Sequence, residues 1–326
     1  MNGKSILITG GTGSFGKAYA SFLLKKYKKI KRLVILSRDE LKQSEMQNVM
    51  DLKKHENLRY FIGDVRDIQR LNRALNKIDI VIHAAALKQV PAAEYNPIEF
   101  IKTNVLGAQN LIEACLNNKV KKVIALSTDK ACAPINLYGA TKLCSDKLFI
   151  AANSYSGGNT KFSIVRYGNV LGSRGSILTL IKKKNKINIT HPEMTRFNIT
   201  LEEGIKLVDW SVTNLSGGEI LVPKIASYKL MDLIKAATGK ANFKIIGLRK
   251  GEKLHEEMIA PGDSFTTYDI GKNFLILPDN SKKRINIVKK KFNNTKKVPE
   301  GFSYNSKDNK QYLSKEKIKK LINKFI

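Results

Sequence analysis

TGGTGSFG, residues 9–16, directly follows the short apolar run Ile6–Ile8. In this order Gly10 permits a tight turn, Gly13 lets the backbone approach a pyrophosphate, and Gly16 allows a helix to pack closely on the preceding strand. A phosphate would then lie at the N-terminus of the helix that follows. The stretch therefore predicts a dinucleotide site at the first strand-to-helix turn. We expect its cofactor-binding residues to be Gly10, Gly13, Ser14, Phe15 and Gly16.

Short apolar runs bounded by turns recur along the first half of the chain and are typical of buried parallel strands. They lie at Ile6–Ile8, Leu33–Leu36, Tyr60–Ile62, Ile80–Ile82, Val123–Leu126 and Phe162–Val165. Segments with helical periodicity lie between them, at Phe15–Tyr27, Leu41–Leu52, Ile68–Leu75, Ile98–Leu116 and Tyr138–Ala152. Strand alternating with helix predicts an α/β fold with a Rossmann-type doubly wound parallel sheet.

The alternation breaks down after about residue 170. We therefore expect an NADP-binding Rossmann domain over residues 1–170 and a smaller C-terminal substrate lobe over residues 171–280. One late apolar run, Glu219–Val222, is expected to return to the main sheet as a strand. Residues 281–326 are rich in Lys and Asn until a short amphipathic end, which predicts a lysine-rich surface extension rather than a third domain.

The net charge is strongly positive, at +30, and comes from 58 Lys and Arg against 28 Asp and Glu. A basic surface attracts polyanions. The lysines, however, are spread along the whole chain without interleaved aromatic residues, which is typical of a solvated surface rather than of a nucleic-acid site. We expect no nucleic-acid partner.

Other classes of protein are also disfavoured by the sequence. No apolar run approaches the length of a membrane helix, about 18 residues, and the chain begins without a signal-peptide pattern. We expect a cytoplasmic protein with no membrane partner. The three Cys and four His are scattered, without the spacing of a disulfide framework or a zinc site, so no metal is expected.

The end of the second strand bears on the choice of cofactor. It continues into Ser37, Arg38 and Asp39, where an NAD enzyme usually places an acid against the adenosine ribose. Arg38, with Lys42 one turn later, suits a 2′-phosphate because a guanidinium pairs bidentately with phosphate oxygens. We therefore expect NADP, with Asp39 also serving as the N-cap of the next helix.

The third and fourth strands also end where a cofactor would lie. Asp64 and Val65 close the third strand and are expected to meet the adenine edge. Ala84, among the small residues that close the fourth strand, leaves room for the cofactor. We expect no catalytic role for His83, because nothing nearby in the sequence tunes it as an acid or base.

The fifth strand ends in Thr128, Asp129 and Lys130, and a helix begins near Tyr138. Tyr138 and Lys142 are four residues apart and so lie on one helix face, where the Lys142 ammonium would favour the phenolate of Tyr138. Tyr138 could then act as a base. Together with the glycine stretch, this spacing predicts oxidation of an alcohol by hydride transfer to the dinucleotide.

TGGTGSFG, the YxxxK spacing and the Thr-Asp strand end resemble the extended short-chain dehydrogenase/reductases. Longer runs are similar to one group among them, the inverting UDP-N-acetylglucosamine 4,6-dehydratases of pseudaminic acid synthesis. These runs are SRDELKQSEM (37–46), STDKACAPINLYGATK (127–142), RYGNVLGSRGS (166–176) and GEKLHE (251–256). The resemblance spans about the first 260 residues and implies bound NADP, a UDP-sugar substrate and a homo-oligomer, with a hexamer as one candidate.

The resemblance also implies a mechanism. Retaining hexose dehydratases have Asp-Glu where this chain has Asp129 and Lys130, and ordinary epimerases have no such pair, so two extra proton-transfer groups imply elimination. Tyr138 would deprotonate the sugar 4-hydroxyl, and Thr128 would hold the substrate. Lys130 would remove the proton on carbon 5, and we expect cations such as Lys142 and the oxidised nicotinamide to lower its pKa for that task. Protonated Asp129 would assist loss of the 6-hydroxyl.

Further contacts are implied by the same resemblance. An Arg clamps a diphosphate and a Glu accepts from ribose hydroxyls, so a nucleotide handle would be recognised away from the reacting carbons. The implied substrate-binding residues are Lys88, Thr128, Asn169, Thr190, Arg249 and Glu252. The implied further cofactor-binding residues are Val170, Leu171, Gly172, Ser173 and Arg174, besides Tyr138 and Lys142.

Two alternatives remain open on the sequence. A sugar-nucleotide 4-epimerase, or a dehydratase that is also a 5-epimerase, would share the fold, the cofactor and the Tyr138–Lys142 pair. A non-enzymatic NADP-binding protein with an anion-binding surface would use the positive charge instead. In a non-enzymatic protein, Asp129 and Lys130 would have no role.

Overall fold

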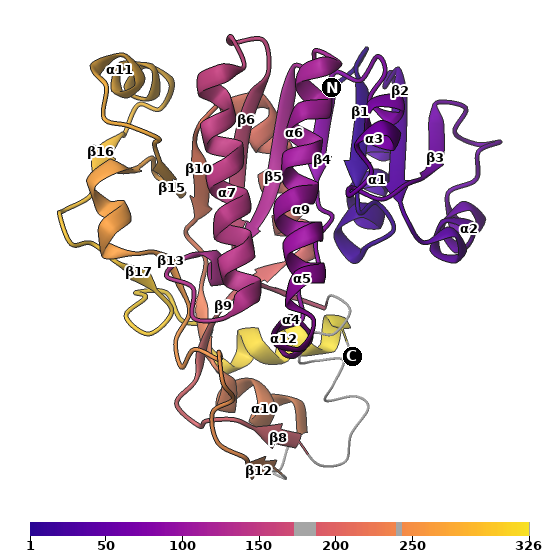
Figure 1. The fold of residues 1–326 in the computed structure, drawn as a ribbon. Coiled ribbons are helices and arrows are strands. Elements are labelled where there is room, and N and C mark those ends of the chain that lie inside the picture. Colours follow the sequence, from indigo (N-terminus) through magenta and orange to yellow (C-terminus); the bar gives the residue numbers. More distant parts are fainter. Residues whose placement is uncertain (173–186, 239–242, 326) are drawn as a thin grey trace. The chain divides into compact units, whose positions relative to one another are not determined.

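A computed structural model describes residues 1–172, 187–238 and 243–325 (Figure 1). The chain forms two compact units, each assembled from segments that are far apart in the sequence. Unit 1 comprises Met1–Ser127, Thr141–Val165 and Ile205–Leu221. Unit 2 comprises Thr128–Ala140, Arg166–Gly204 and Val222–Ile326. Among the described residues, no helix has the length and apolar character needed to cross a membrane.

Unit 1 is built on a parallel sheet. Its strands run in the order β10 (Ile220–Pro223), β6 (Lys161–Tyr167), β5 (Lys122–Thr128), β4 (Ile80–His83), β1 (Ser5–Thr9), β2 (Arg32–Ser37) and β3 (Leu58–Ile62). β1 pairs in parallel with both β2 and β4, so the chain reverses its direction of winding at β1. This order is that of a doubly wound nucleotide-binding sheet. The predicted Rossmann-type α/β fold is confirmed, and the late strand β10 pairs in parallel with β6.

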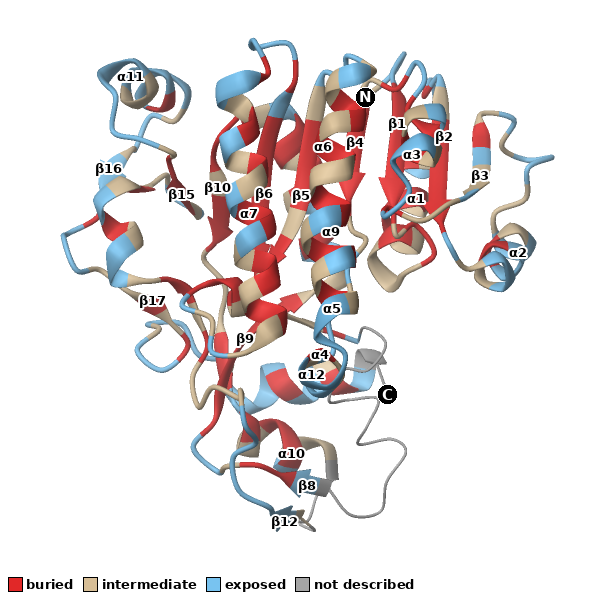
Figure 2. Cartoon of the chain, in the orientation of Figure 1, coloured by how far each residue is buried: buried red, intermediate tan, exposed pale blue. Residues whose placement is uncertain are grey.

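The inner strands β1, β2 and β4 are buried on both faces, which explains why they are apolar, whereas the edge strand β3 is partly exposed (Figure 2). Leu7 and Val34 belong to a core cluster with residues of α3 (Ile68–Ala74), α6 (Gly107–Asn117) and α7 (Leu137–Tyr155). Their neighbours Ile6 and Ile35 point to the opposite face and are fully buried as well. Helix α1 (Ser14–Lys26) is joined to α9 (Leu201–Asn214) by an ion pair of 2.6 Å between Lys26 and Asp209.

One predicted helix is interrupted. The periodicity of Ile98–Leu116 predicts a single helix, but the structure has α5 (Pro97–Phe100), a π-helical segment η1 (Ile101–Leu106) and then α6. Gly107 follows the π-helix, and a Cβ atom there would lie 2.8 Å from Val65 Cγ2. The wider π-helical turn and the absence of a side chain at Gly107 allow the start of α6 to lie close to the loop after β3. Such π-turns inside helices are frequent at functional sites.

Unit 2 contains several small sheets. One has the order β11 (Ser227–Lys229), β9 (Thr195–Thr200), β7 (Asn169–Leu171). Strand β14 (Thr267–Asp269) instead pairs antiparallel with β15 (Asn273–Ile276) and β16 (Lys296–Lys297), and these three strands are part of a ten-stranded sheet. Two-stranded pairs join β8 (Ile187–Ile189) to β12 (Phe243–Ile245) and β13 (Glu257–Ile259) to β17 (Tyr304–Asn305). Its helices are α10 (Leu230–Thr238), α11 (Lys282–Lys291) and α12 (Lys315–Phe325). Short 3-10 turns lie at η2 (Asp129–Ala131) and η3 (Pro261–Thr266).

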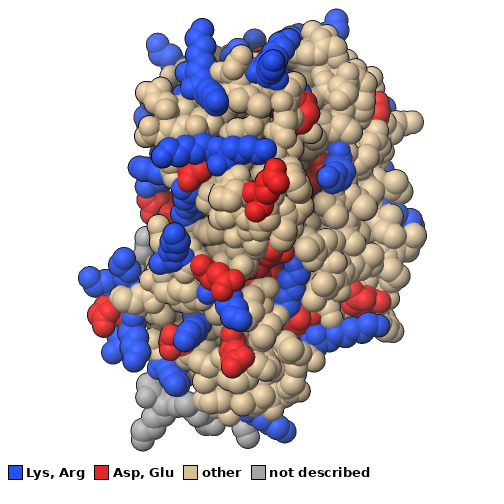
Figure 3. Space-filling model, turned by 90° about the vertical axis from the view of Figure 1, so that its left-hand side faces the viewer, with Lys and Arg blue, Asp and Glu red and all other residues tan. Residues whose placement is uncertain are grey.

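The end of the chain is part of the core of unit 2. Ile318 and Ile322 of α12 are 1% and 5% exposed and pack in one cluster with Leu233 and Ile234 of α10. The lysines of α11, and those of α12 from Lys315 to Lys320, are exposed. On the face drawn in Figure 3, Lys and Arg lie at separate places with Asp and Glu between them. The amphipathic end of the sequence thus supplies two core residues to an otherwise charged segment.

Candidate active site

The glycine stretch of unit 1 forms a close turn between β1 and α1. Gly10 has φ +63°, and a Cβ atom there would lie 2.8 Å from the backbone of Ala85. A Cβ at Gly16 would lie 2.5 Å from the Gly11 oxygen, so only glycine allows α1 to begin this near the strand. Gly13 is the N-cap of α1 and makes no side-chain cap. The turn therefore fits a pyrophosphate held by backbone N–H groups.

Gly10→Ala is expected to unfold more easily and to bind the dinucleotide poorly. A left-handed backbone conformation costs an L-residue about 1–2 kcal/mol, before any clash with Ala85 is counted. Urea denaturation would measure the loss of stability, and a fluorescence titration with NADP would measure binding. Gly204→Ala in α9 is the matched control, because its added Cβ meets nothing within 4 Å. Equal stability of the two variants would contradict the prediction.

The adenosine end of the turn is polar. Ser37 is buried and its hydroxyl lies 2.8 Å from Thr12 Oγ1. The Asp39 side chain accepts from Lys42 N at 3.0 Å and also pairs with Lys42 Nζ, so its predicted role as N-cap of α2 (Glu40–Val49) is confirmed. The Arg38 side chain is 54% exposed and lies 3.7 Å from Asp64. An exposed guanidinium at this point fits an adenosine 2′-phosphate.

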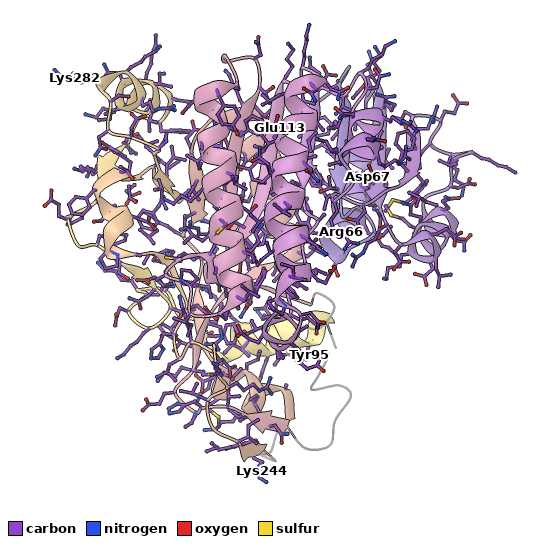
Figure 4. All side chains as sticks on the ribbon, in the orientation of Figure 1. Arg66, Asp67, Tyr95, Glu113, Lys244 and Lys282 are labelled. Atoms are coloured by element: carbon purple, nitrogen blue, oxygen red, sulfur yellow. The ribbon has the colours of Figure 1, made fainter. Side chains whose placement is uncertain are left out.

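Asp64 is held by two arginines at the end of β3. Arg66 Nη2 donates to Asp64 Oδ2 at 2.8 Å. Arg66 and Asp67, which precede α3 in the chain, are labelled in Figure 4. Burial raises the pKa of the Asp64 carboxyl, but the hydrogen bonds from Arg66 outweigh burial and hold this pKa below its usual value. Val65 beside it is 5% exposed. Asp64 is thus a charged group that orients Arg38 as well as Arg66.

The end of β4 is occupied by a neutral histidine. His83 Nδ1 lies 2.8 Å from Thr9 Oγ1, which also accepts from Ala84 N at 3.2 Å. Burial, and then the Lys142 ammonium, lower the pKa of His83 to about 3. His83 is thus a neutral, hydrogen-bonded histidine at the end of β4.

Lys142 is 3% exposed within unit 1. Burial lowers the pKa of its ammonium, and the charge of Asp146, one helical turn later, opposes this shift. Asp146 accepts from Ser127 Oγ at 2.6 Å. Asp146 was not among the predicted site residues, although its spacing of four residues from Lys142 was a signal for it.

Asn104, in the π-helix, was also missed. Its side chain exchanges hydrogen bonds of 2.9 Å with the backbone of Leu87 and donates to Thr141 Oγ1 at 3.0 Å. It therefore joins the loop after β4 to the helix that carries Lys142. Nothing in the local sequence marks this asparagine, because its partners come from two other segments.

In unit 2, the reactive residues meet around Lys130. Lys130 Nζ lies 3.1 Å from Asp129 Oδ1 and 3.1 Å from Glu256 Oε1, and it donates to Asn169 Oδ1 at 3.3 Å. Thr128 caps the η2 turn by accepting from Lys130 N, and its hydroxyl donates to Asp129 Oδ1 at 2.9 Å. The structure thus brings together four predicted residues, Thr128, Asp129, Lys130 and Asn169, and adds Glu256.

Tyr138 begins α7 beside this turn. It is 8% exposed. A Cβ atom at the next residue, Gly139, would lie 2.2 Å from the carbonyl oxygen of Lys130, so glycine lets the first turn of the helix rest on the η2 backbone. Gly139 N also donates to Asn136 Oδ1 at 2.8 Å. The order Tyr-Gly in YGATK therefore has a packing reason as well as a chemical one.

The charges around Lys130 differ from those expected. Burial raises the pKa of Asp129, and the Glu256 carboxylate adds to this shift against the opposing Lys130 ammonium. Burial lowers the pKa of Lys130, but the carboxylates of Asp129 and Glu256 outweigh it and raise the pKa above its ordinary value. The prediction of a lowered lysine pKa is wrong for this state of the protein. Arg196 is the nearby cation that opposes the rise.

The remaining predicted residues lie in different surroundings. Thr190 is buried and donates to Met194 Sδ at 3.2 Å, Arg249 is exposed, and Glu252 lies 3.8 Å from Arg196. Lys88 is exposed in the loop after β4 of unit 1. Val170 and Leu171 belong to β7, and Gly172 follows with φ +78°. Ser173 and Arg174 lie outside the described residues.

Comparisons with known proteins cover nearly the whole chain. Residues 6–278 match a family model described as polysaccharide biosynthesis protein. A UDP-N-acetylglucosamine 4,6-dehydratase (inverting) of Campylobacter jejuni is 52% identical, over 99% of this chain and 98% of that protein. A UDP-glucose 4-epimerase of Rickettsia akari is 41% identical, over 98% and 95%. The X-ray structure of Pen from Bacillus thuringiensis has a TM-score of 0.89 and 36% identity, over 99% and 98%.

Proposed function

This chain belongs to the polysaccharide biosynthesis protein family, and we propose that it is a UDP-N-acetylglucosamine 4,6-dehydratase that inverts carbon 5. The observation that carries the proposal is the buried group of Asp129, Lys130 and Glu256 at the end of β5. An epimerase needs one base for one hydroxyl, whereas loss of water needs further groups that move protons. The full-length similarity to the Campylobacter dehydratase agrees with this reading.

The first step of the proposed reaction is oxidation at carbon 4. Tyr138 takes the proton of the 4-hydroxyl, and the Lys142 ammonium favours the phenolate that does so. Bound NADP would supply the chemistry of accepting hydride from carbon 4 and returning it to carbon 6. The ketone at carbon 4 acidifies the hydrogen on carbon 5.

The second step is the elimination. Asp129, whose raised pKa keeps its proton, gives it to the 6-hydroxyl as the bond from carbon 6 to oxygen breaks and water leaves. Lys130 takes the proton from carbon 5, but only after its own ammonium has lost a proton. The Glu256 carboxylate, 3.1 Å away, holds this ammonium in place until then. A proton returned to carbon 5 on the opposite face gives UDP-2-acetamido-2,6-dideoxy-β-L-arabino-hexos-4-ulose.

The proposed cofactor is NADP rather than NAD, on the strength of Arg38. Arg38→Ala is expected to weaken NADP binding about tenfold or more, because a hydrogen bond to a charged group contributes about 1.5–3 kcal/mol. NAD binding should change little. Isothermal titration with both dinucleotides measures the difference, and Arg73→Ala, an exposed arginine on α3, is the control. Equal losses for NADP and NAD would contradict the assignment.

The function itself is tested by one incubation. Purified protein and UDP-N-acetylglucosamine in deuterated water, without added cofactor, are followed by proton NMR. A 6-methyl signal with deuterium at carbon 5 and L-arabino couplings is the expected result. A galacto product without a methyl signal would instead identify a 4-epimerase, the activity named for the Rickettsia relative. Unchanged substrate would redirect the search to another sugar nucleotide.

We also propose which residues bind the nucleotide part of the substrate. Arg249, which is exposed, would clamp the diphosphate, and Glu252 would accept from the ribose. The Arg249–Glu252 segment is a turn, closed by a hydrogen bond of 3.1 Å from Glu252 N to Arg249 O. Lys88, Asn169 and Thr190 are the other proposed contacts, and a homo-oligomer is the proposed assembly.

A further inference from the structure

Two buried carboxylates share one ammonium in unit 2. Asp129 and Glu256 each place an oxygen 3.1 Å from Lys130 Nζ, and their side chains are 0% and 3% exposed. Their other oxygens, Asp129 Oδ2 and Glu256 Oε2, are buried, and neither has a hydrogen-bond partner among the described residues. The Lys130 ammonium can balance only one of the two charges at this depth, so the other carboxyl needs a second cation or keeps its proton.

The surrounding groups decide which carboxyl is ionised. Glu256 Oε1 lies 3.5 Å from Arg196 Nε, and the Lys253 ammonium also acts on Glu256. The charges that act on Asp129 are the Lys130 ammonium and the Glu256 carboxylate, with the Thr128 hydroxyl beside it. Glu256 therefore has the more positive surroundings.

Two further neighbours face the group. Glu252, 3.8 Å from Arg196, offsets part of the positive charge that Arg196 presents to Glu256, and Tyr228, 2% exposed, is another titratable side chain near the group. Burial raises the pKa of both carboxyls, yet the pKa of Glu256 falls below its ordinary value because of Lys130 and Arg196, whereas that of Asp129 rises.

We propose that Glu256 is a positioning residue that keeps Asp129 in its acid form, because it holds the Lys130 ammonium and so leaves the proton on Asp129. The inference rests on the proposed dehydratase function, in which Asp129 gives that proton to the departing 6-hydroxyl. Glu256 acts through Lys130 and Asp129 and needs no contact with the sugar. Burial is the first cause that favours the acid form of Asp129, and the Glu256 carboxylate adds to it.

The test is a titration of Asp129 itself. Protein labelled with ¹³C-aspartate is titrated by NMR, and the Asp129 signal is identified by its loss in Asp129→Asn. The wild-type midpoint is expected well above the ordinary aspartate value of about 3.9. In Glu256→Gln it should move to lower pH by about one to three units, since a like charge nearby has been removed. Glu257→Gln is the matched control, because Glu257 accepts from Ser303 at 2.7 Å and should leave the midpoint unchanged.

The same shift should be visible in catalysis. The activity on UDP-N-acetylglucosamine falls at alkaline pH as Asp129 loses its proton, and in Glu256→Gln this fall is expected at lower pH by the same amount. The NMR titration needs no turnover, so an inactive wild type would remove the dehydratase function and still leave the midpoints to decide the role of Glu256. Superimposed midpoints of wild type and Glu256→Gln would overturn the proposal.

A second variant keeps the test decisive if Glu256→Gln does not fold. Glu256→Asp withdraws the carboxylate from Lys130 by one methylene, and it is expected to move the Asp129 midpoint in the same direction by a smaller amount. An unmoved midpoint in the folded Glu256→Asp protein would overturn the proposal, as would a wild-type Asp129 that titrates at the ordinary value.

Discussion

Lys130→Met is expected to lower kcat by about 10² to 10⁴, the usual contribution of a positioned acid or base. The methionine side chain has a similar length but cannot take the proton from carbon 5. The variant should therefore still oxidise carbon 4, because that step depends on Tyr138. Rapid quenching and mass spectrometry of the bound sugar would find the 4-keto hexose, without deuterium at carbon 5 in deuterated water.

The stability of Lys130→Met must be measured together with its kcat. Removing Lys130 leaves Asp129 and Glu256 without their shared cation, and breaking a buried ion pair commonly costs about 3–5 kcal/mol. Thermal unfolding separates a misfolded protein from a folded one that lacks its base. Lys147→Met, an exposed lysine on α7, is the control and should match the wild type in both measurements. Deuterium at carbon 5 in folded Lys130→Met would assign the base elsewhere.

Tyr138→Phe is expected to block the reaction one step earlier. The phenyl ring fills the same space at the start of α7 but has no oxygen to accept the proton of the 4-hydroxyl, so kcat should again fall by about 10² to 10⁴. Rapid quenching should recover UDP-N-acetylglucosamine and no 4-keto sugar. Lys130→Met should therefore contain the 4-keto sugar, and Tyr138→Phe should contain unreacted UDP-N-acetylglucosamine. A general loss of folding would not produce this difference.

The control for Tyr138→Phe lies on the same helix. Tyr155 is 54% exposed near the end of α7, and Tyr155→Phe should leave both rate and product unchanged. Substrate binding, measured by titration, should be similar in Tyr138→Phe and wild type, because one hydroxyl contributes little to the hold on a nucleotide sugar. A 4-keto sugar formed at the wild-type rate by Tyr138→Phe would exclude this tyrosine as the base.

The parts of the fold that depend on local pattern could be predicted from the sequence. The strands and most helices of unit 1 occur where apolar runs and periodicity place them, because a strand buried on both faces is continuously apolar. The π-turn at Ile101–Leu106 could not be predicted, because the apolar pattern of Ile98–Leu116 continues through it without a break. Helix α11 and strand β16 could not be predicted either, because lysine dominates the segment that contains them.

The candidate site divides in the same way. Thr128, Asp129 and Lys130 are adjacent in the chain, so their proximity follows from the sequence. Glu256 and Arg196 reach Lys130 from β-rich segments much later in the chain, and no local rule connects them. The error over the pKa of Lys130 has this cause only in part: the neighbouring Asp129 is the first carboxylate that raises this pKa, and Glu256, whose position only the fold reveals, adds to the rise.

The packing of α12 has a consequence for how the protein is made. Ile318 and Ile322 are synthesised more than 80 residues after Leu233 and Ile234, yet they lie in the same core. Burying an isoleucine contributes about 1.5–3 kcal/mol, so unit 2 lacks a substantial part of its stability while these residues are still inside the ribosome. Proteolysis before Lys315 would leave the same unfilled core.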